Sequence, residues 1–167
     1  LNAVARMVKA GEIDLPDVDL DADEDYFSVW AMVDSGAGAN VARRSQIPGS
    51  RESRSAPRIS LTIANGETLP NRGARTATCF DKSGSQCERT FYDAPVEMPI
   101  LSVTEISKEG RSGSEVRFRE RDGVIIDNAT GRTTPFVKRM GVYFMRLYFS
   151  KSAGDPQHTE DFHRLDR

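Results

Sequence analysis

The chain has 167 residues, of which 38% are hydrophobic and 29% are charged, and its formal net charge at pH 7 is -2. This length and composition predict one ordinary globular domain with some flexible sequence at its ends. The small net charge gives no overall reason to expect a nucleic-acid or membrane partner, and no apolar run approaches the roughly 20 residues that span a bilayer.

Residues 1–26 are predicted to be a flexible acidic leader. A short helix-like piece, 1–9, is followed by closely spaced carboxylates, which repel one another and resist packing. These are Asp14, Asp17, Asp19, Asp21, Asp23, Glu24 and Asp25. The run lacks the glycine and the distant glutamate of a calcium loop, so we interpret it as a solvated linker rather than a metal site.

A buried strand is predicted over 29–33. It is followed immediately by an aspartate, a serine and a glycine. The residues are Asp34, Ser35 and Gly36, with Ala37 next. A buried strand seldom ends on a carboxylate without a use for it, because burying an unpaired charge is costly. Gly36 lets the backbone turn sharply and approach another chain closely. An aspartic peptidase needs this arrangement at its catalytic loop.

The segment after this loop is rich in serine and arginine. Its arginines are Arg43, Arg44, Arg51, Arg54 and Arg58. Such a cluster could contact a phosphate backbone, but no aromatic stacking platform accompanies it. We therefore interpret the segment as a solvated loop, with a turn at Pro48-Gly49.

From residue 59 the sequence alternates between apolar and polar, which predicts antiparallel β structure. Asn65-Gly66 is a strong hairpin signal because both residues tolerate positive φ. A second hairpin is predicted to turn at Ser83-Gly84. The predicted strands are 59–63, a return from 67, 74–80 and 87–93.

The second hairpin would make Cys79 and Cys87 cross-strand neighbours. They could form a disulfide, but no secretory leader is visible, so we expect free thiols and an intracellular, cytoplasmic protein. Neither is a convincing nucleophile, since no histidine lies near them in the sequence.

One short helix is predicted over 103–109. Ser102 and Glu105 fit a capping box, and Gly110 is a plausible end signal. Further β-prone runs follow this helix. They are 115–119, 124–127 and 141–149.

Residues 150–167 are predicted to be a flexible polar tail. His158 and His163 have a spacing that could hold a metal on a helix, but a disordered end is our interpretation. The expected organisation is thus a leader, one folded domain over 27–149, and this tail.

The ordered series of motifs resembles the protease region of copia-type retrotransposon polyproteins, a branch of the retropepsin-like aspartic peptidases. Residues 33–37 resemble the catalytic loop of that family, 61–66 its flap hairpin, and 99–103 the segment behind the loop. The match spans 29–149. Ser102 is a departure, since retropepsins often carry a glycine there, and the loop packing behind the site is expected to differ.

The resemblance implies a mainly β, retropepsin-like closed β-barrel or half-barrel with one short α-helix. It implies an aspartic-type endopeptidase that cleaves a polypeptide substrate, its own retroelement polyprotein, and that needs no cofactor or metal. The implied catalytic residues are Asp34, Ser35 and Gly36. The implied substrate-binding residues are Ala37, Ala64, Asn65 and Gly66.

Hydrolysis by this class needs two carboxylates about 3 Å apart that share one proton. The chain has one Asp-Ser-Gly motif, and Asp127, which lacks the hydroxyl and the glycine, is interpreted as a hairpin-end residue. A homodimer with Asp34 of each copy at its axis is therefore expected. The alternatives are a catalytically degenerate module for dimerisation or peptide binding and, ranked lowest, nucleic-acid binding through 43–58.

Overall fold

The computed structural model describes residues 2–13, 15, 25–62, 66–81 and 84–151. Over these residues the chain is mainly β, which confirms the predicted class. The strands are β1 (Tyr26–Asp34), β2 (Val41–Ala42), β3 (Arg51–Glu52), β4 (Leu61–Thr62), β5 (Thr68–Leu69), β6 (Ala74–Phe80), β7 (Gln86–Asp93), β8 (Ile100–Ser102), β9 (Ser114–Phe118), β10 (Asp122–Asp127), β11 (Thr133–Arg139) and β12 (Val142–Ser150). The helices are α1 (Asn2–Lys9), α2 (Val103–Ile106) and a 3-10 helix, η2 (Arg44–Gln46).

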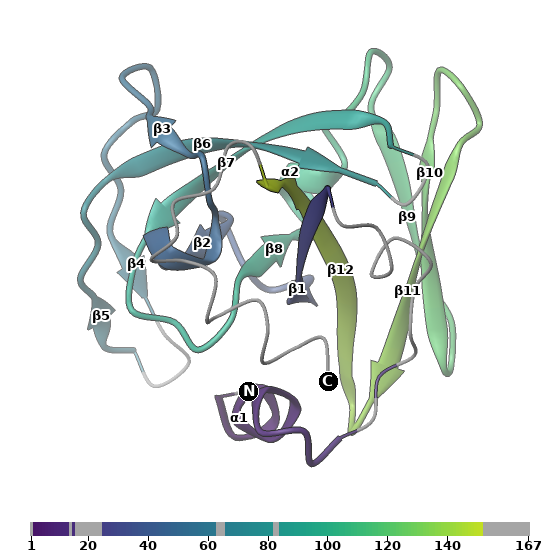
Figure 1. The fold of residues 1–167 in the computed structure, drawn as a ribbon, viewed down its shortest axis with the longest axis horizontal. Helices are drawn as coiled ribbons and strands as arrows, with labels where there is room; N and C mark the ends of the chain where they lie inside the picture. The colour runs from purple at the N-terminus through teal and green to yellow at the C-terminus, as the bar shows by residue number, and fades with distance from the viewer. Residues whose placement is uncertain (1, 14, 16–24, 63–65, 82–83, 152–167) are drawn as a thin grey trace.

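Ten of these strands form one sheet, in the order β3-β6-β7-β2-β8-β1-β12-β11-β10-β9. An additional pairing joins β6 to β12 where Phe80 lies opposite Tyr148. The strands from β6 through β7, β2, β8 and β1 to β12 therefore close into a ring, and β11, β10 and β9 extend from it (Figure 1). β4 and β5 form a separate two-stranded sheet.

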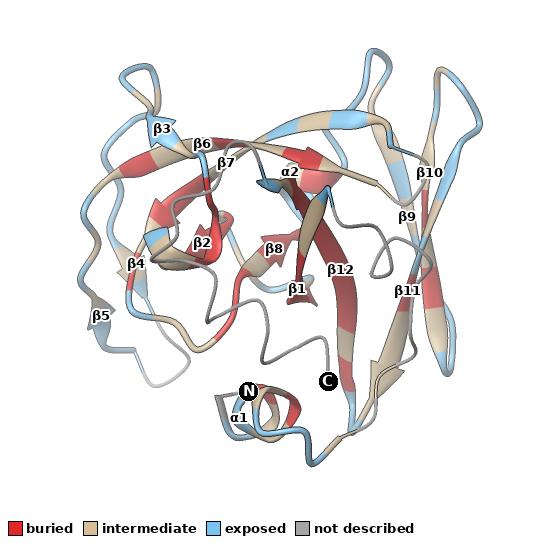
Figure 2. Ribbon diagram, in the orientation of Figure 1, coloured by how far each residue is buried: buried red, intermediate tan, exposed pale blue. Residues whose placement is uncertain are grey.

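β1 lies between β12 and β8 within this ring. It pairs antiparallel with β12 from Tyr26 to Val33, and parallel with β8 from Met32 to Asp34. The run from Ser28 to Val33 is buried, as expected for a strand covered on both faces. Figure 2 shows that β12 is buried along most of its length as well. The end of β1 is thus held by two neighbours, which fixes the position of Asp34.

α1 agrees with the helix-like piece expected at 1–9, but it corrects the prediction that this piece belongs to a flexible leader. Ala5 and Val8 of α1 are buried in the hydrophobic core. Ala5 and Val8 are one helical turn apart and share a face, so their burial gains the hydrophobic stabilisation that a solvated leader lacks. Most of the acidic run that follows α1 lies outside the described residues, which exclude 14 and 16–24.

The predicted hairpins are present, with differences in length. β6 has the predicted bounds, and β7 begins one residue before the predicted strand. β4 and β5 pair through Leu61 opposite Leu69, while residues 63–65 and 82–83 lie outside the described part. α2 ends at Ile106 because the backbone then continues in tighter turns, with Glu109 N bonded to the carbonyl of Ile106. No helix in the described ranges is long and apolar enough to cross a membrane.

Candidate functional site

The predicted catalytic residues lie together in the loop that follows β1. Asp34 is half-buried at the strand end, whereas Ser35 and Gly36 are exposed. The Gly36 N–H donates to Asp34 Oδ1 at 2.8 Å, and the Ala37 N–H approaches the Asp34 carbonyl at 3.4 Å. The loop therefore orients the carboxylate with its own backbone.

Gly36 fits this loop for a steric reason. A Cβ atom at this position would lie 3.3 Å from Asp34 Oδ1, closer than most such contacts. The glycine thus permits the close approach of the backbone N–H to the carboxylate within this chain.

Ser102 connects this loop to the helix behind it. Its hydroxyl donates to the carbonyl of Ala37 at 2.7 Å and accepts from the Glu105 N–H at 3.3 Å, as an N-cap residue does. The capping role was predicted, whereas the bond to the loop was not. A glycine at this position would lack both bonds, so the serine gives the loop a polar support.

Asn40 is a supporting residue that the sequence analysis missed. It is buried, its Oδ1 accepts from the Ser102 N–H at 2.8 Å, and its Nδ2 donates to the carbonyl of Thr90 at 3.2 Å. It therefore joins β8, which lies beside β1, to β7. The only sign of this role in the sequence was weak: Asn40 is a polar residue between the Asp34 loop and β2.

A cavity of about 330 Å³ lies beside Asp34. Asp34 and Ser35 at the end of β1 line it together with Phe118 and Tyr143. The two rings meet edge to face with centroids 4.8 Å apart, and Phe118 is 41% exposed. A carboxylate and apolar aromatic surface thus border the same space, which suits a ligand that combines polar backbone with apolar side chains.

The predicted flap residues are placed only in part. Ala64 and Asn65 lie outside the described residues. Gly66 is exposed with a φ of 86°, as a hairpin turn requires, and its hairpin belongs to the separate β4–β5 sheet. Gly66 is therefore not part of the sheet that carries Asp34, and its role at the site stays a prediction.

Asp127 is a turn residue, as predicted. Its Oδ1 accepts from the N–H groups of Ala129 and Thr130 at 2.8 and 3.2 Å. It lines a different cavity from the one beside Asp34. It is therefore not placed to complete a carboxylate pair with Asp34 of the same chain.

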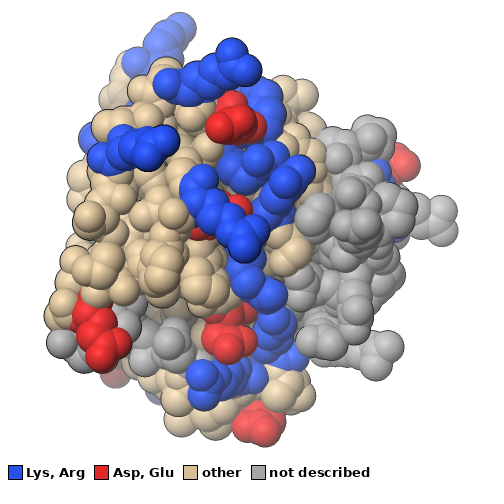
Figure 3. All heavy atoms as spheres, turned by 90° about the vertical axis from the view of Figure 1, so that its left-hand side faces the viewer, with Lys and Arg blue, Asp and Glu red and all other residues tan. Residues whose placement is uncertain are grey.

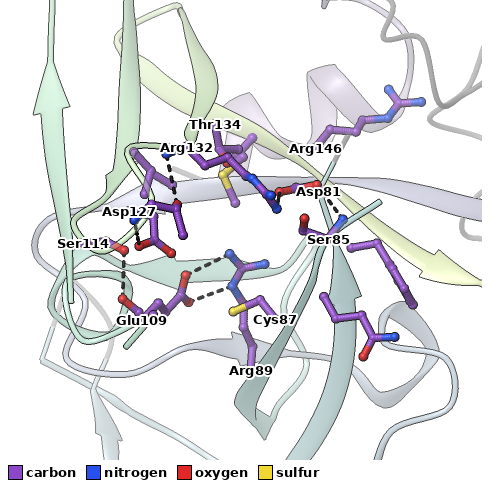
Figure 4. Close-up of a pocket in the computed structure, with 16 residues that line it drawn as sticks. Asp81, Ser85, Cys87, Arg89, Glu109, Ser114, Asp127, Arg132, Thr134 and Arg146 are labelled. Atoms are coloured by element: carbon purple, nitrogen blue, oxygen red, sulfur yellow. Dashed lines mark hydrogen bonds and ion pairs between the residues drawn. The ribbon is translucent and has the colours of Figure 1, made fainter. Parts of the chain in front are cut away.

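That second cavity, of about 190 Å³, is built around an ion pair (Figure 4). Arg89 of β7 donates to both carboxylate oxygens of Glu109 at 2.8 and 3.0 Å, and the two side chains are 10% and 15% exposed. Burial by itself would lower the pKa of Arg89, but the Glu109 carboxylate outweighs it and the pKa is raised. This ion pair links the segment after α2 to β7 in the closed ring of strands, which we call the barrel.

The cysteines lie opposite each other on β6 and β7, as predicted, and both are free thiols. Burial raises the pKa of Cys79 to about 11 and also raises that of Cys87. Because the thiolate is the reactive form, both are weak nucleophiles at neutral pH.

Within the described part of the chain, no three His, Cys, Asp or Glu side chains gather in a way that could hold a metal ion. His158 and His163 lie outside that part. Comparison with known proteins adds no relative, since no family model, curated protein or solved structure matches the sequence.

Proposed function

We propose that the chain is a retropepsin-like aspartic endopeptidase that cleaves polypeptides, its own retroelement polyprotein among them, as a homodimer. One observation carries the proposal. The half-buried Asp34 carboxylate lies at the end of a buried central strand, oriented by the Gly36 N–H and beside a cavity of about 330 Å³. An oriented carboxylate next to a cavity is the arrangement that general acid-base hydrolysis uses.

The second carboxylate comes from the symmetry mate. Two Asp34 groups brought together at a two-fold axis cannot both ionise, so one activates a water molecule as general base and the other donates a proton to the scissile carbonyl. The exposure of Ser35 and Gly36 supports this assembly because it leaves the loop accessible to a second copy. Asp127 offers no substitute, since its carboxylate caps a turn.

Substrate binding is proposed to involve the loop and the β4–β5 hairpin. Ala37 follows Gly36 in the loop, and its small side chain leaves room beside the oriented carboxylate. The hairpin tip, with Ala64, Asn65 and Gly66, would close over an extended peptide and offer backbone hydrogen bonds. The aromatic wall at Phe118 and Tyr143 supports a peptide with an apolar side chain near the cleaved bond.

The test is Asp34→Asn, assayed by mass spectrometry on a peptide library in the acid to neutral range. We expect cleavage to be lost while the circular dichroism spectrum and the thermal midpoint stay unchanged, because the amide keeps the oxygen that accepts from Gly36. Asp127→Asn is the matched control, since it also removes one charge and keeps the turn acceptor, and it should retain cleavage.

Cleavage by the Asp34→Asn chain would refute the proposal. An unaltered chain that forms dimers and binds peptides but cleaves none would instead favour the alternative of a degenerate binding module.

A further inference from the structure

The arginine-rich segment after η2 folds against the start of β6, and this brings together arginines that are distant in the sequence. The Ser53 N–H donates to the carbonyl of Ala74 at 2.9 Å. Arg75 donates to Ser50 through both Nε, to the hydroxyl at 2.9 Å, and Nη2, to the carbonyl at 2.6 Å. Arg54 is therefore beside the β6 backbone.

Two further contacts place Arg72 in the same cluster. The N–H groups of Arg44 and Arg72 both donate to Asp93, one to Oδ1 at 3.1 Å and the other to the carbonyl at 2.8 Å. Arg58 is brought close because the side chain of Asn71 donates to the carbonyl of Ile59 at 3.1 Å. The sequence predicted a loop cluster, whereas the structure forms a continuous surface from two segments.

We call this surface the arginine face. It comprises Arg43, Arg44, Arg51, Arg54, Arg58, Arg72 and Arg75. Figure 3 shows Lys and Arg side chains gathered in a band that runs down the side of the molecule carrying β3, β4 and β5. Among the described residues, Glu52 and Asp93 act on Arg75 and Glu88 pairs with Arg51, so these carboxylates lie beside the arginine face.

Over the described residues, the arginine face carries more positive charge than the carboxylates beside it offset. Arg51 pairs with Glu88 at 2.6 Å, Arg75 is engaged with Ser50, and Arg43 Nε donates to the carbonyl of Val96 at 2.9 Å. Four others are exposed, and among the described residues their guanidinium groups make no hydrogen bond or ion pair. They are Arg44, Arg54, Arg58 and Arg72. Burial and the nearby charge of Arg44 lower the pKa of Arg75, as crowding of like charges does.

We propose that the arginine face binds the phosphate backbone of a single nucleic-acid strand without reading its sequence. The planar guanidinium group matches phosphate oxygens in pairs, and a band of such groups fits an extended partner with regularly repeated charges. Tyr92, the aromatic residue next to Asp93, is buried and donates to the carbonyl of Pro57 at 2.6 Å, so it offers no stacking surface. Contacts confined to phosphates carry no sequence information.

The experiment measures binding of a fluorescein-labelled oligouridylate of about 20 nucleotides by fluorescence anisotropy. With four free arginines neutralising phosphates, affinity should fall about fiftyfold between about 50 mM and 200 mM salt, from a slope of about 0.7 per contact for single strands. The chain carrying Arg44→Gln, Arg54→Gln, Arg58→Gln and Arg72→Gln should lose most of this binding. Its fold should be retained because, within the described residues, the substitutions remove no hydrogen bond or ion pair of these side chains.

A matched control removes the same number of charges elsewhere. The chain with Arg111→Gln, Arg117→Gln, Arg119→Gln and Arg121→Gln changes exposed arginines around β9 and β10, on the side of the molecule away from β3–β5 (Figure 1). It should bind the oligouridylate within about threefold of the unaltered chain, a difference of less than about 0.7 kcal/mol.

Three results would overturn the proposal. They are no binding at the lowest salt, an equal loss in both altered chains, and displacement of the oligouridylate by a polyglutamate of matched charge. The second would mean that only net charge matters, and the third would identify an acidic polypeptide as the partner.

Discussion

At Asp34 a single backbone hydrogen bond decides where the carboxylate points. The Gly36 N–H donates to Oδ1 at 2.8 Å, and a Cβ atom on residue 36 would crowd the same oxygen at 3.3 Å. A backbone donor aimed at one carboxylate oxygen fixes the orientation of the group. The geometry of the proposed active site therefore depends on a residue that carries no functional group of its own.

Gly36→Ala tests this dependence. The new Cβ would lie 3.3 Å from Asp34 Oδ1, so the carboxylate must shift by a few tenths of an ångström. We expect peptide cleavage to fall about tenfold, because small misplacements of reacting groups are costly, with little change in thermal stability. Gly38→Ala is the control, since nothing lies within 4 Å of its added Cβ. Equal effects of the two substitutions would contradict the prediction.

Cys79 makes the stability of the protein depend on pH in the alkaline range. Its pKa is about 11 in the folded chain against 9.0 for the unperturbed thiol, because of burial. Between these values the unfolded chain loses the proton first, so folding stability falls as the pH rises. The loss should approach about 2 to 3 kcal/mol.

Urea unfolding at several pH values between 8 and 11 measures this effect for the unaltered chain and for Cys79→Ala. The alanine chain is destabilised at every pH by the lost packing, but its stability should decline less steeply. Parallel declines in the two chains would show that Cys79 does not contribute.

At the scale of elements, the prediction succeeded where the pattern was local. β6 follows from an extended run, and α2 begins where Ser102 caps it. β11 was missed because Pro135 lies inside it and argues against a strand. The structure tolerates this proline because β11 pairs with β12 only from Val137 onward, so no bond toward β12 needs the missing N–H.

Other features could not be found from local patterns at all. The two-residue strand β2 exists because it pairs with β7 and β8, which are distant in sequence. For the candidate site, the Asp34 loop was predicted, whereas its support by Asn40 depends on a bond between residues 62 positions apart. Long-range pairing of this kind leaves no periodic signal in the chain.

The pair of Arg89 and Glu109 gives a prediction at the same scale, because it joins β7 to the segment after α2. Glu109→Gln would leave a buried guanidinium without its counter-charge, which costs about 3 to 5 kcal/mol. Glu88→Gln is the matched control, because it breaks an ion pair in which both side chains are more than half exposed, and this costs at most about 1 kcal/mol. Thermal or urea unfolding compares the two, and similar losses would contradict the prediction.

At the scale of the whole molecule, the barrel carries one Asp34 while the proposed chemistry needs two. The Asp34→Asn chain should therefore have a dominant-negative effect, because a mixed dimer lacks one of the two Asp34 carboxylates and does not cleave. When equal amounts of unaltered and Asp34→Asn chains exchange partners freely, about a quarter of the dimers are fully active, and total cleavage falls to about half of that from the unaltered chain alone. Adding the Asp127→Asn chain should raise cleavage instead.

If cleavage stays constant when the Asp34→Asn chain is added, the unaltered chain is active as a monomer, which would contradict the prediction. The same experiment at rising total concentration should show cleavage per chain increasing to a plateau, since association precedes hydrolysis.

The pairing of β1 with β12 also fixes where the barrel begins and ends. Tyr26 lies opposite Ser150, and the N–H of Lys151 donates to the carbonyl of Asp25 at 2.9 Å. Neighbouring entry and exit points allow such a unit to be spliced into a surface loop of an unrelated host protein without stretching that loop.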